Sequence, residues 1–177
     1  MIMPAKSVLA ALLLAAPSSI WAAPCDDGSA PRFEDYPASS AVIERRGKLK
    51  LNNRFARKYR TALREGLRDY PIEFAGRYVV VTFGCGTTCM FGGWVDAQSG
   101  EAFGMPGILD TFGPFGVETP LVFRADSRLV ITLGAARSDE TRPEASYYEW
   151  TGVNLEPICT RILTTEEAVS LGRADAR

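Results

Sequence analysis

The clearest periodic pattern of apolar residues in the chain lies between residues 52 and 71. Its apolar positions recur every four residues, which is the spacing of an amphipathic helix with one buried stripe. They are Phe55, Tyr59, Leu63 and Leu67. Asn52 or Asn53 can cap the start of this helix, and Pro71 forces its end. We therefore predict a helix over residues 53–70 whose apolar stripe packs on a sheet.

After this helix the pattern changes to short runs rich in β-branched and aromatic residues, separated by turn residues. The run at 76–84 is apolar on both alternations, which favours a central strand. Further runs form pairs joined by turns that contain Asp, Gly or Asn, which is typical of β-hairpins. These pairs are 90–97 with 100–105, 120–125 with 128–134, and 146–151 with 155–163. Pro157 indicates that the last strand is an edge.

The chain ends with a second helical pattern, at residues 164–173. Thr164 stands three residues before Glu167, which is the spacing of a capping box at the start of a helix. The elements together predict a single α+β domain. In it, a meandering antiparallel sheet of six to eight strands carries the helix at 53–70 on one side, and a short helix ends the chain.

Residues 1–22 have the pattern of a cleaved secretory signal. Lys6 gives a positive start, the apolar run at 8–16 is too short to span a bilayer, and Pro17 breaks it before small residues. An uncleaved membrane anchor is the alternative, but no charged flank that would stop transfer follows the run. We therefore predict a periplasmic or secreted protein without a stable membrane anchor, in which residues 23–177 form the mature domain.

Composition and charge fit this interpretation without pointing to a ligand. Without residues 1–22 the 177-residue chain retains 155 residues, the usual size of one domain. Lys6 is the only charged residue removed, so 19 Lys and Arg remain against 21 Asp and Glu, a net charge of −2. This balance gives no indication of nucleic-acid binding, and no later apolar run is long enough to span a membrane.

The cysteines predict a disulfide-stapled fold. Four of them remain after removal of the signal, and an even number in an exported chain ordinarily indicates disulfides. Three pairings are possible. We favour Cys85–Cys89 together with Cys25–Cys159, because the first pair can meet locally through Gly86 and the second would tie the N-terminal arm to the last strand.

Two chemical alternatives exist for the segment between Cys85 and Cys89. Thioredoxin-like redox motifs have two residues between the cysteines and precede a helix, whereas here there are three and a strand-like run follows. A zinc site needs four ligands, but the chain has no histidine, and thiolates in an oxidising compartment tend to oxidise. We therefore expect neither a metal nor a cofactor.

The lack of histidine also narrows the enzyme classes. Ser-His-Asp and Cys-His arrangements and His-ligated metal sites are excluded, which leaves carboxylate chemistry such as that of a glycoside hydrolase. The candidate acids are Asp96, Glu101, Asp110, Glu118 and Asp126. Aspartate is common in turns for structural reasons, and Asp96 and Asp126 lie in predicted turns. We assign no catalytic residue.

A strongly basic stretch lies in and before the predicted helix. Residues 44–68 contain ten Lys or Arg against Glu44 and Glu65, a local charge of +8. Such a face would attract anionic lipid, polysaccharide or an acidic protein. It could equally be a solvated helix face that is balanced by acids elsewhere.

The glycine- and aromatic-rich segments 89–94 and 104–116 form a second candidate surface. Loops carried on a sheet often hold recognition residues, and aromatic side chains anchor interfaces. The same rings could instead cover the end of the sheet as ordinary core. The candidate binding residues are Arg77, Tyr78, Thr87, Thr88, Phe91, Trp94, Phe112 and Phe115.

Segments spread over most of the mature chain resemble a family of small exported bacterial proteins of unassigned function. They are "FEDYP" (33–37), "RKYRTALREG" (57–66), "EFAGRYVVVTFGCGTTC" (73–89), "WVDAQSGEAF" (94–103), "FRADSRLVITLGA" (123–135) and "YYEW" (147–150). The family pattern runs Phe-Ala-Gly-x-Tyr, Gly-Cys-Gly-Thr-x-Cys and Val-Asp-Ala-x-x-Gly. Arg77 stands where that pattern has histidine, Glu73 where it has asparagine, and Phe83 where it has tryptophan. The resemblance implies an architecture and no activity.

Two hypotheses of function follow. The first is an exported, non-catalytic envelope protein that binds a protein or an envelope polysaccharide through the Gly/aromatic surface, as an inhibitor or immunity-like factor. The second is a secreted enzyme, either a carboxylate-based glycan hydrolase or a thiol-disulfide oxidoreductase using Cys85 and Cys89. The missing histidine and the expected staples favour the first.

Overall fold

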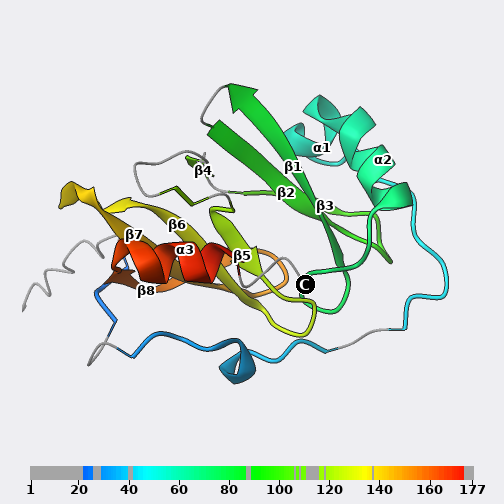
Figure 1. Cartoon of the computed structure of the whole chain (residues 1–177). Helices are drawn as coiled ribbons and strands as arrows, with labels where there is room; N and C mark the ends of the chain where they lie inside the picture. The colour runs from blue at the N-terminus through cyan, green and yellow to red at the C-terminus, as the bar shows by residue number, and fades with distance from the viewer. Residues whose placement is uncertain are drawn as a thin grey trace, which may run out of the picture.

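The structure is a computed structural model in which two antiparallel sheets face each other and helices lie on their outer sides (Figure 1). The residues it describes are 22–25, 29–39, 42–86, 89–105, 107, 109–110, 116–117, 119–136 and 138–173. Almost all of the predicted signal lies outside these residues. Within them, no helix has both the length and the apolar character needed to cross a membrane.

The first sheet is built on the β1–β2 hairpin. Its strands β1 (Tyr78–Gly86), β2 (Cys89–Asp96) and β3 (Ala102–Gly104) are neighbours in that order. The short strand β4 (Leu109–Asp110) pairs with the first residues of β2. All of these pairings are antiparallel, as the short connections between the runs predicted.

The second sheet is a meander of consecutive strands. Its order is β5 (Leu121–Phe123), β6 (Leu129–Ala136), β7 (Asp139–Trp150) and β8 (Leu155–Ile162). Pro157 lies in β8 at an edge of the sheet, where its missing N–H is tolerated, so this prediction is confirmed.

The prediction of one sheet with six to eight strands is therefore wrong. The α+β class and the antiparallel pairing hold, but the strands divide into two sheets of four. The 76–84 run is apolar on both alternations because residues 78–81 of β1 are covered on both faces, by a helix on one side and by the second sheet on the other. β1 is an edge strand of its own sheet, not a central one.

The amphipathic helix forms on the outer face of the first sheet, in two pieces. The Asn53 side chain caps α1 (Arg54–Lys58) by accepting a hydrogen bond of 2.8 Å from the Ala56 N–H. At Tyr59 the backbone leaves helical geometry, with φ −107° and ψ 22°, and α2 (Arg60–Asp69) follows. The predicted single helix at 53–70 is thus broken at one residue.

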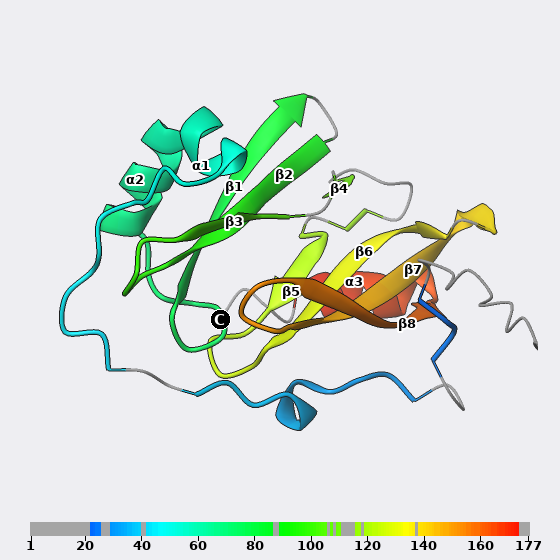
Figure 2. The same cartoon turned by 180° about the vertical axis from the view of Figure 1, so that it is seen from behind.

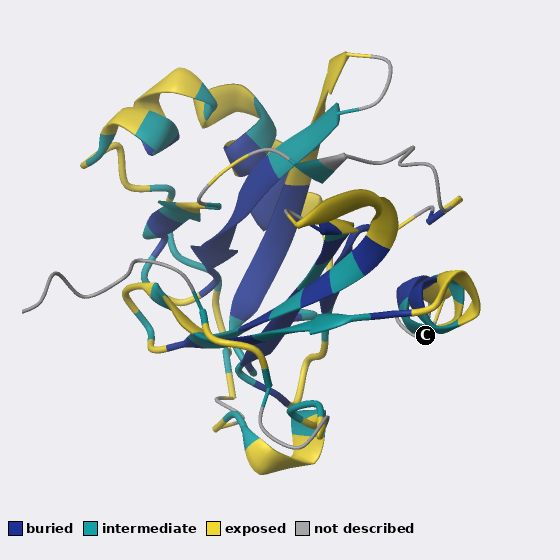
Figure 3. Cartoon of the chain, turned by 90° about the vertical axis from the view of Figure 1, so that its left-hand side faces the viewer, coloured by how far each residue is buried: buried dark blue, intermediate teal, exposed yellow. Residues whose placement is uncertain are grey.

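Three apolar layers hold the elements together. The outer layer between the helices and the first sheet contains Leu63, Leu67, Val79, Val81 and Val95. The layer between the two sheets contains Phe74, Tyr78, Val80, Trp94, Val130 and Trp150. Figure 3 shows the described ribbon dark blue where the sheets face each other. Successive strand residues point to opposite faces, so each sheet supplies side chains to two layers.

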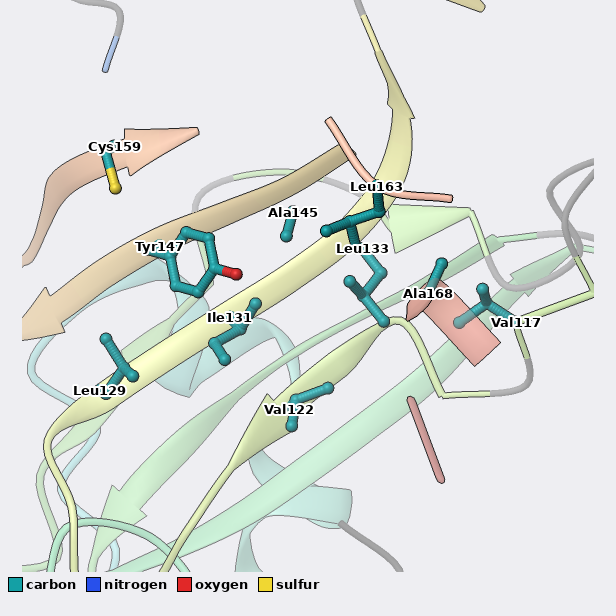
Figure 4. Close-up of a cluster of buried hydrophobic side chains, with 10 residues drawn as sticks. All are labelled: Val117, Val122, Leu129, Ile131, Leu133, Ala145, Tyr147, Cys159, Leu163 and Ala168. Carbon is teal, nitrogen blue, oxygen red and sulfur yellow. The ribbon is translucent and has the colours of Figure 1, made fainter. Parts of the chain in front are cut away.

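The third layer lies between the second sheet and the C-terminal helix α3 (Thr165–Arg173). Leu129, Ile131, Ala145 and Tyr147 come from β6 and β7 and belong to one buried cluster with Ala168 of α3 (Figure 4). Burial raises the pKa of Tyr147, so its phenol stays protonated in this layer.

The N-terminal arm runs along the second sheet before it reaches the first (Figure 2). Cys25 lies at disulfide distance from Cys159 with a Cα separation of 4.9 Å, which is the predicted pairing. The Cys25 N–H also donates to the Thr160 carbonyl at 2.9 Å, so the arm extends the β8 edge. Farther on, the buried Ser127 hydroxyl donates to the carbonyl of Phe33 at 2.8 Å. The arm is therefore an integral part of the fold.

The capping box at the start of α3 is confirmed. The Glu167 N–H donates to Thr164 Oγ1 at 3.1 Å, and the Thr164 N–H donates to Glu167 Oε2 at 2.7 Å. Arg161 Nη2 donates to the other Glu167 oxygen at 2.6 Å. The hydrogen bond from the Thr164 backbone, followed by that from Arg161, lowers the pKa of Glu167 below its ordinary value of 4.5.

We expect Glu167→Gln to weaken the loss of stability in acid. Because the folded-state pKa of Glu167 is lowered, the carboxylate stabilises the fold fully above its unfolded pKa of about 4.5. This contribution is lost as the pH falls through the lower folded-state pKa. Urea unfolding between neutral pH and about pH 3 should therefore show a shallower acid decline in the variant.

Thr164→Ala is the matched control, because it keeps both the carboxylate and the Thr164 backbone N–H. It should lower the free energy of unfolding by about 1 kcal/mol while retaining the acid decline. Equal acid slopes for wild type and Glu167→Gln would contradict the assigned role of the carboxylate.

Candidate functional site

The Cys85 and Cys89 corner is the tip of the β1–β2 hairpin. The two cysteines lie at disulfide distance with a Cα separation of 5.2 Å, and Gly86 pairs with Cys89 across an irregularity in the register. Residues 84–86 are exposed, and Figure 3 shows the end of β1 in yellow. Both cysteines are in strands, so the helix N-terminus that lowers the thiol pKa in thioredoxin-like sites is missing here.

A cluster of aromatic rings packs next to this tip. Phe83 and Phe91 face each other across the hairpin with ring centroids 5.1 Å apart. Tyr59, at the break between α1 and α2, contacts both rings at 5.0 and 5.1 Å. Phe91, a predicted binding residue, is therefore half-buried in a cluster that fixes the hairpin to the helices.

Gly93, in "FGGW", and Gly104 have a packing role. A Cβ at Gly93 would lie 2.8 Å from Cζ of the Phe55 ring, and one at Gly104 would lie 3.0 Å from Cδ2 of the same ring. Such distances leave no room for a side chain, so glycine allows α1 to lie close to β2 and β3. The Phe55 ring therefore occupies the space beside the backbone at Gly93 and Gly104, where a ligand would otherwise have room.

Arg77 lies at the opposite end of the hairpin from the cysteines. Its Nη2 donates to Oδ2 of Asp96 at 2.5 Å, and the Asp96 side chain is nearly buried. The other Asp96 oxygen accepts from the N–H groups of Gln98 and Ser99 at 2.9 and 3.1 Å. This pair holds the turn between β2 and β3 in place.

Tyr78 and Trp94 are core residues between the sheets. They are 6% and 2% exposed, and both rings contact Trp150 edge to face, with centroids 5.6 and 4.9 Å away. Burial raises the pKa of Tyr78, which keeps its phenol neutral. Neither side chain is on a surface that a partner could reach.

The predicted binding residues thus do not form one surface within the described part of the chain. Arg77, Tyr78, Phe91 and Trp94 divide between a turn, the inter-sheet core and the aromatic cluster. Four others, Thr87, Thr88, Phe112 and Phe115, lie outside the described residues.

The candidate acids are also dispersed. Asp96 is engaged by Arg77, Glu101 accepts a hydrogen bond from Asn52 at 3.2 Å, and Asp126 pairs with Arg124 at 3.2 Å. Glu118 and the Asp110 side chain are outside the described structure. In the part of the chain that is described, no group of three or more Cys, Asp or Glu is arranged to hold a metal ion.

A hollow opens between the two sheets, where side chains of the second sheet become small and polar. Its floor consists of cross-strand pairs of β6 and β7: Val130 with Tyr148, Thr132 with Ser146, and Gly134 with Glu144. Along β6 the inward side chain shrinks from valine to threonine to glycine. The apolar layer therefore ends here, and the sheets separate into a cleft, which we call the inter-sheet cleft.

The other wall of the inter-sheet cleft comes from the loop after β3. Met105, Gly107 and Leu109 line it, and they are described residues of the predicted Gly/aromatic segment at 104–116. The cleft has a volume of about 330 Å³, at the small end of the range for ligand pockets in proteins. It can take a small molecule or a side chain of a partner.

The chemistry of the cleft is that of recognition by hydroxyl groups beside an apolar wall. In the described structure, the hydroxyls of Thr132, Ser146 and Tyr148 make no hydrogen bond to the protein. Glu144 is the charged side chain among the described lining residues. Hydroxyls both donate and accept, so the cleft suits an uncharged polar group attached to an apolar body.

Thr132, Glu144, Ser146 and Tyr148 were not among the predicted site residues. A signal was present, because the inward alternation of 128–134 loses bulk while the other alternation, Leu129, Ile131 and Leu133, stays large. This loss of bulk indicates a cleft only when the face with the smaller side chains is known to lie against a second sheet.

Comparison of the chain with protein-family models, with curated proteins and with solved structures finds no match in any of the three.

Proposed function

We propose that the protein is an exported, non-catalytic envelope protein that binds a partner protein through the inter-sheet cleft, as an inhibitor or immunity-like factor. The observation that carries the proposal is the position of three described residues of the 104–116 segment. Met105, Gly107 and Leu109 form one wall of a cleft whose opposite wall offers free hydroxyls. Recognition residues on a loop above a rigid sheet are a common arrangement in binding proteins.

The size and lining of the cleft favour an inserted side chain of the partner. A volume of about 330 Å³ is small for an extended glycan but suits one or two side chains. Binding energy in such interfaces concentrates where an anchor fills a desolvated pocket. A side chain with an apolar body and a polar end would contact Leu109 and donate to Ser146.

The enzyme alternatives have less support. A glycan hydrolase needs two carboxyl groups about 5 to 9.5 Å apart in a cleft, whereas Glu144 alone supplies a carboxylate among the described lining residues. A thiol oxidoreductase would use Cys85, which stands in a strand at a hairpin tip. A binding role needs neither feature.

We expect a variant with a filled cleft to lose its partner. Ser146→Leu places an apolar side chain on the cleft floor, where space is available. The mature protein and this variant would each be used for native capture from envelope extract, and the affinity for the purified partner would be measured by calorimetry. Blocking the anchor pocket should weaken binding by roughly tenfold or more.

Thr141→Leu is the matched control, because it adds a leucine at an exposed position of the same strand. It should bind like wild type. The proposal fails if Ser146→Leu retains full affinity, if the captured partner is a polysaccharide, or if the wild-type protein cleaves a cell-wall fragment.

A further inference from the structure

A second hollow lies on the opposite side of the first sheet, between α2 and the arm that precedes α1. Its volume is about 640 Å³. Four cationic side chains surround an apolar floor: Arg46, Lys48, Arg64 and Arg68 around Leu49 and Leu67. We call this hollow the basic groove. No acidic side chain lines it among the described residues.

The basic groove is held in shape by backbone hydrogen bonds. The Gly47 N–H donates to the Ala97 carbonyl and the Lys50 N–H to the Gly100 carbonyl, both at 2.8 Å. These bonds fasten the arm to the turn between β2 and β3. Arg46 Nη1 donates to the Leu67 carbonyl at 2.6 Å and joins the arm to α2. Hydrogen bonds of the fold therefore bring the cations of the arm and of α2 together, in addition to their closeness in the sequence.

Two of the four cationic side chains interact with other groups of the protein, and the other two make no ion pair in the described structure. Arg46 satisfies a carbonyl at the C-terminal end of α2, and Arg68 pairs with Asp69 at 2.7 Å. Lys48 and Arg64 are exposed and have no ion-pair partner in the part of the chain that is described. A helix face that served only solubility would not need these two cations beside an apolar floor.

Exposed apolar side chains flank the same region. Large hydrophobic residues with high exposure in the described structure are Val42, Leu51, Tyr70 and Val153, and the first three lie in or next to the basic stretch. Their exposed fractions are 89%, 40% and 49%. Basic side chains together with protruding apolar ones are the usual composition of a surface that binds an anionic membrane peripherally.

We propose that the basic groove and its flanks bind the surface of a membrane that contains anionic phospholipids. A lipid phosphate lies between Lys48 and Arg64, and Leu49 contacts the apolar part of the same lipid. The other exposed cations of α1 and α2 face the surrounding headgroups, while Val42 and Leu51 reach into the interface. Contact of this peripheral kind with a membrane surface is reversible.

The expected strength follows from the charges. Each basic side chain near an anionic leaflet improves binding by about fivefold, and salt screens the attraction beyond roughly 8 Å at physiological ionic strength. Removing the positive charges of Lys48 and Arg64 should therefore weaken binding by about thirtyfold, and reversing them by more.

The test is sedimentation of the mature protein with vesicles. We expect binding to vesicles of phosphatidylglycerol and phosphatidylcholine, little binding to phosphatidylcholine alone, and a decline with added salt. The double variant Lys48→Glu, Arg64→Glu should lose at least about thirtyfold in affinity for the anionic vesicles. The double variant Arg142→Glu, Arg173→Glu makes the same charge change at exposed positions on the second sheet and α3, and it should bind like wild type.

Soluble anions separate the lipid surface from other sources of negative charge. Inorganic phosphate, glycerol phosphate and heparin are each titrated against vesicle-bound protein. Weak competition by all three supports the proposal. It is overturned if anionic vesicles are not bound at low salt, if both double variants lose binding equally, or if phosphate or heparin binds more tightly than the vesicles do.

Discussion

Replacement of Cys159 by serine is expected to lower the free energy of unfolding by about 5 kcal/mol. The disulfide to Cys25 joins positions separated by 134 residues, so its loss releases a long loop of the unfolded chain. It also frees the N-terminal arm from the β8 edge, where Cys25 and Thr160 share a backbone hydrogen bond. Chemical denaturation under non-reducing conditions measures the difference.

The other disulfide provides the comparison. Cys85 and Cys89 close a loop of only a few residues, and the pair Cys85→Ser, Cys89→Ser should cost about 2 kcal/mol. Alkylation followed by mass spectrometry should find the free thiol of the Cys159→Ser protein at Cys25. A thiol at Cys85 instead, or a smaller loss than that of the hairpin variant, would contradict the structural importance of the long crosslink.

Replacement of Trp150 by alanine is expected to cost about 3 to 5 kcal/mol, because it opens a cavity in the layer between the sheets. The indole of Trp150 contacts the rings of Trp94, Phe103 and Tyr78, with centroids 4.9, 5.0 and 5.6 Å away. Trp150 is 2% exposed, so truncating its side chain removes almost entirely buried apolar surface from the core. Thermal and urea unfolding both report the change.

Tyr70→Ala serves as the control for removing an aromatic side chain, because Tyr70 is half-exposed at the end of α2. Its effect should stay within about 0.5 kcal/mol. If Trp150→Ala were as mild as this control, the two sheets would have to be held together by something other than the aromatic layer.

The local elements were predictable because their signals are local. The stripe of Phe55, Tyr59, Leu63 and Leu67 predicted the helix. It did not predict the break at Tyr59, whose ring contacts Phe83 and Phe91 from elsewhere in the chain. Turn chemistry predicted the hairpins, and the capping box predicted the start of α3.

The division into two sheets was not predictable from the same signals. Alternation along 76–84 shows that both faces of the strand are buried, but it does not say against what. Val79 and Val81 pack under α2, whereas Tyr78 and Val80 face the second sheet. Burial of a strand face by a helix and burial by a second sheet produce the same pattern of apolar residues in the sequence.

The candidate site was predicted in part for a related reason. The 104–116 segment was singled out by its glycines, and three of its described residues, Met105, Gly107 and Leu109, border the inter-sheet cleft. The aromatic residues of 89–94 predicted a recognition surface, but Gly93 makes room for Phe55, and the second sheet covers the indole of Trp94. The cleft floor was missed because threonine and serine in a strand are unremarkable until the facing layer is known.

The link between Cys25 and Cys159 also bears on the order in which the molecule matures. A polypeptide emerges from the ribosome, or from a membrane pore, with its first residues leading. The native partner of Cys25 therefore becomes available only when position 159 has appeared and β8 can join its neighbours. Oxidation of this pair is then a late event that marks completion of the second sheet, and a chain truncated before β8 could never be locked.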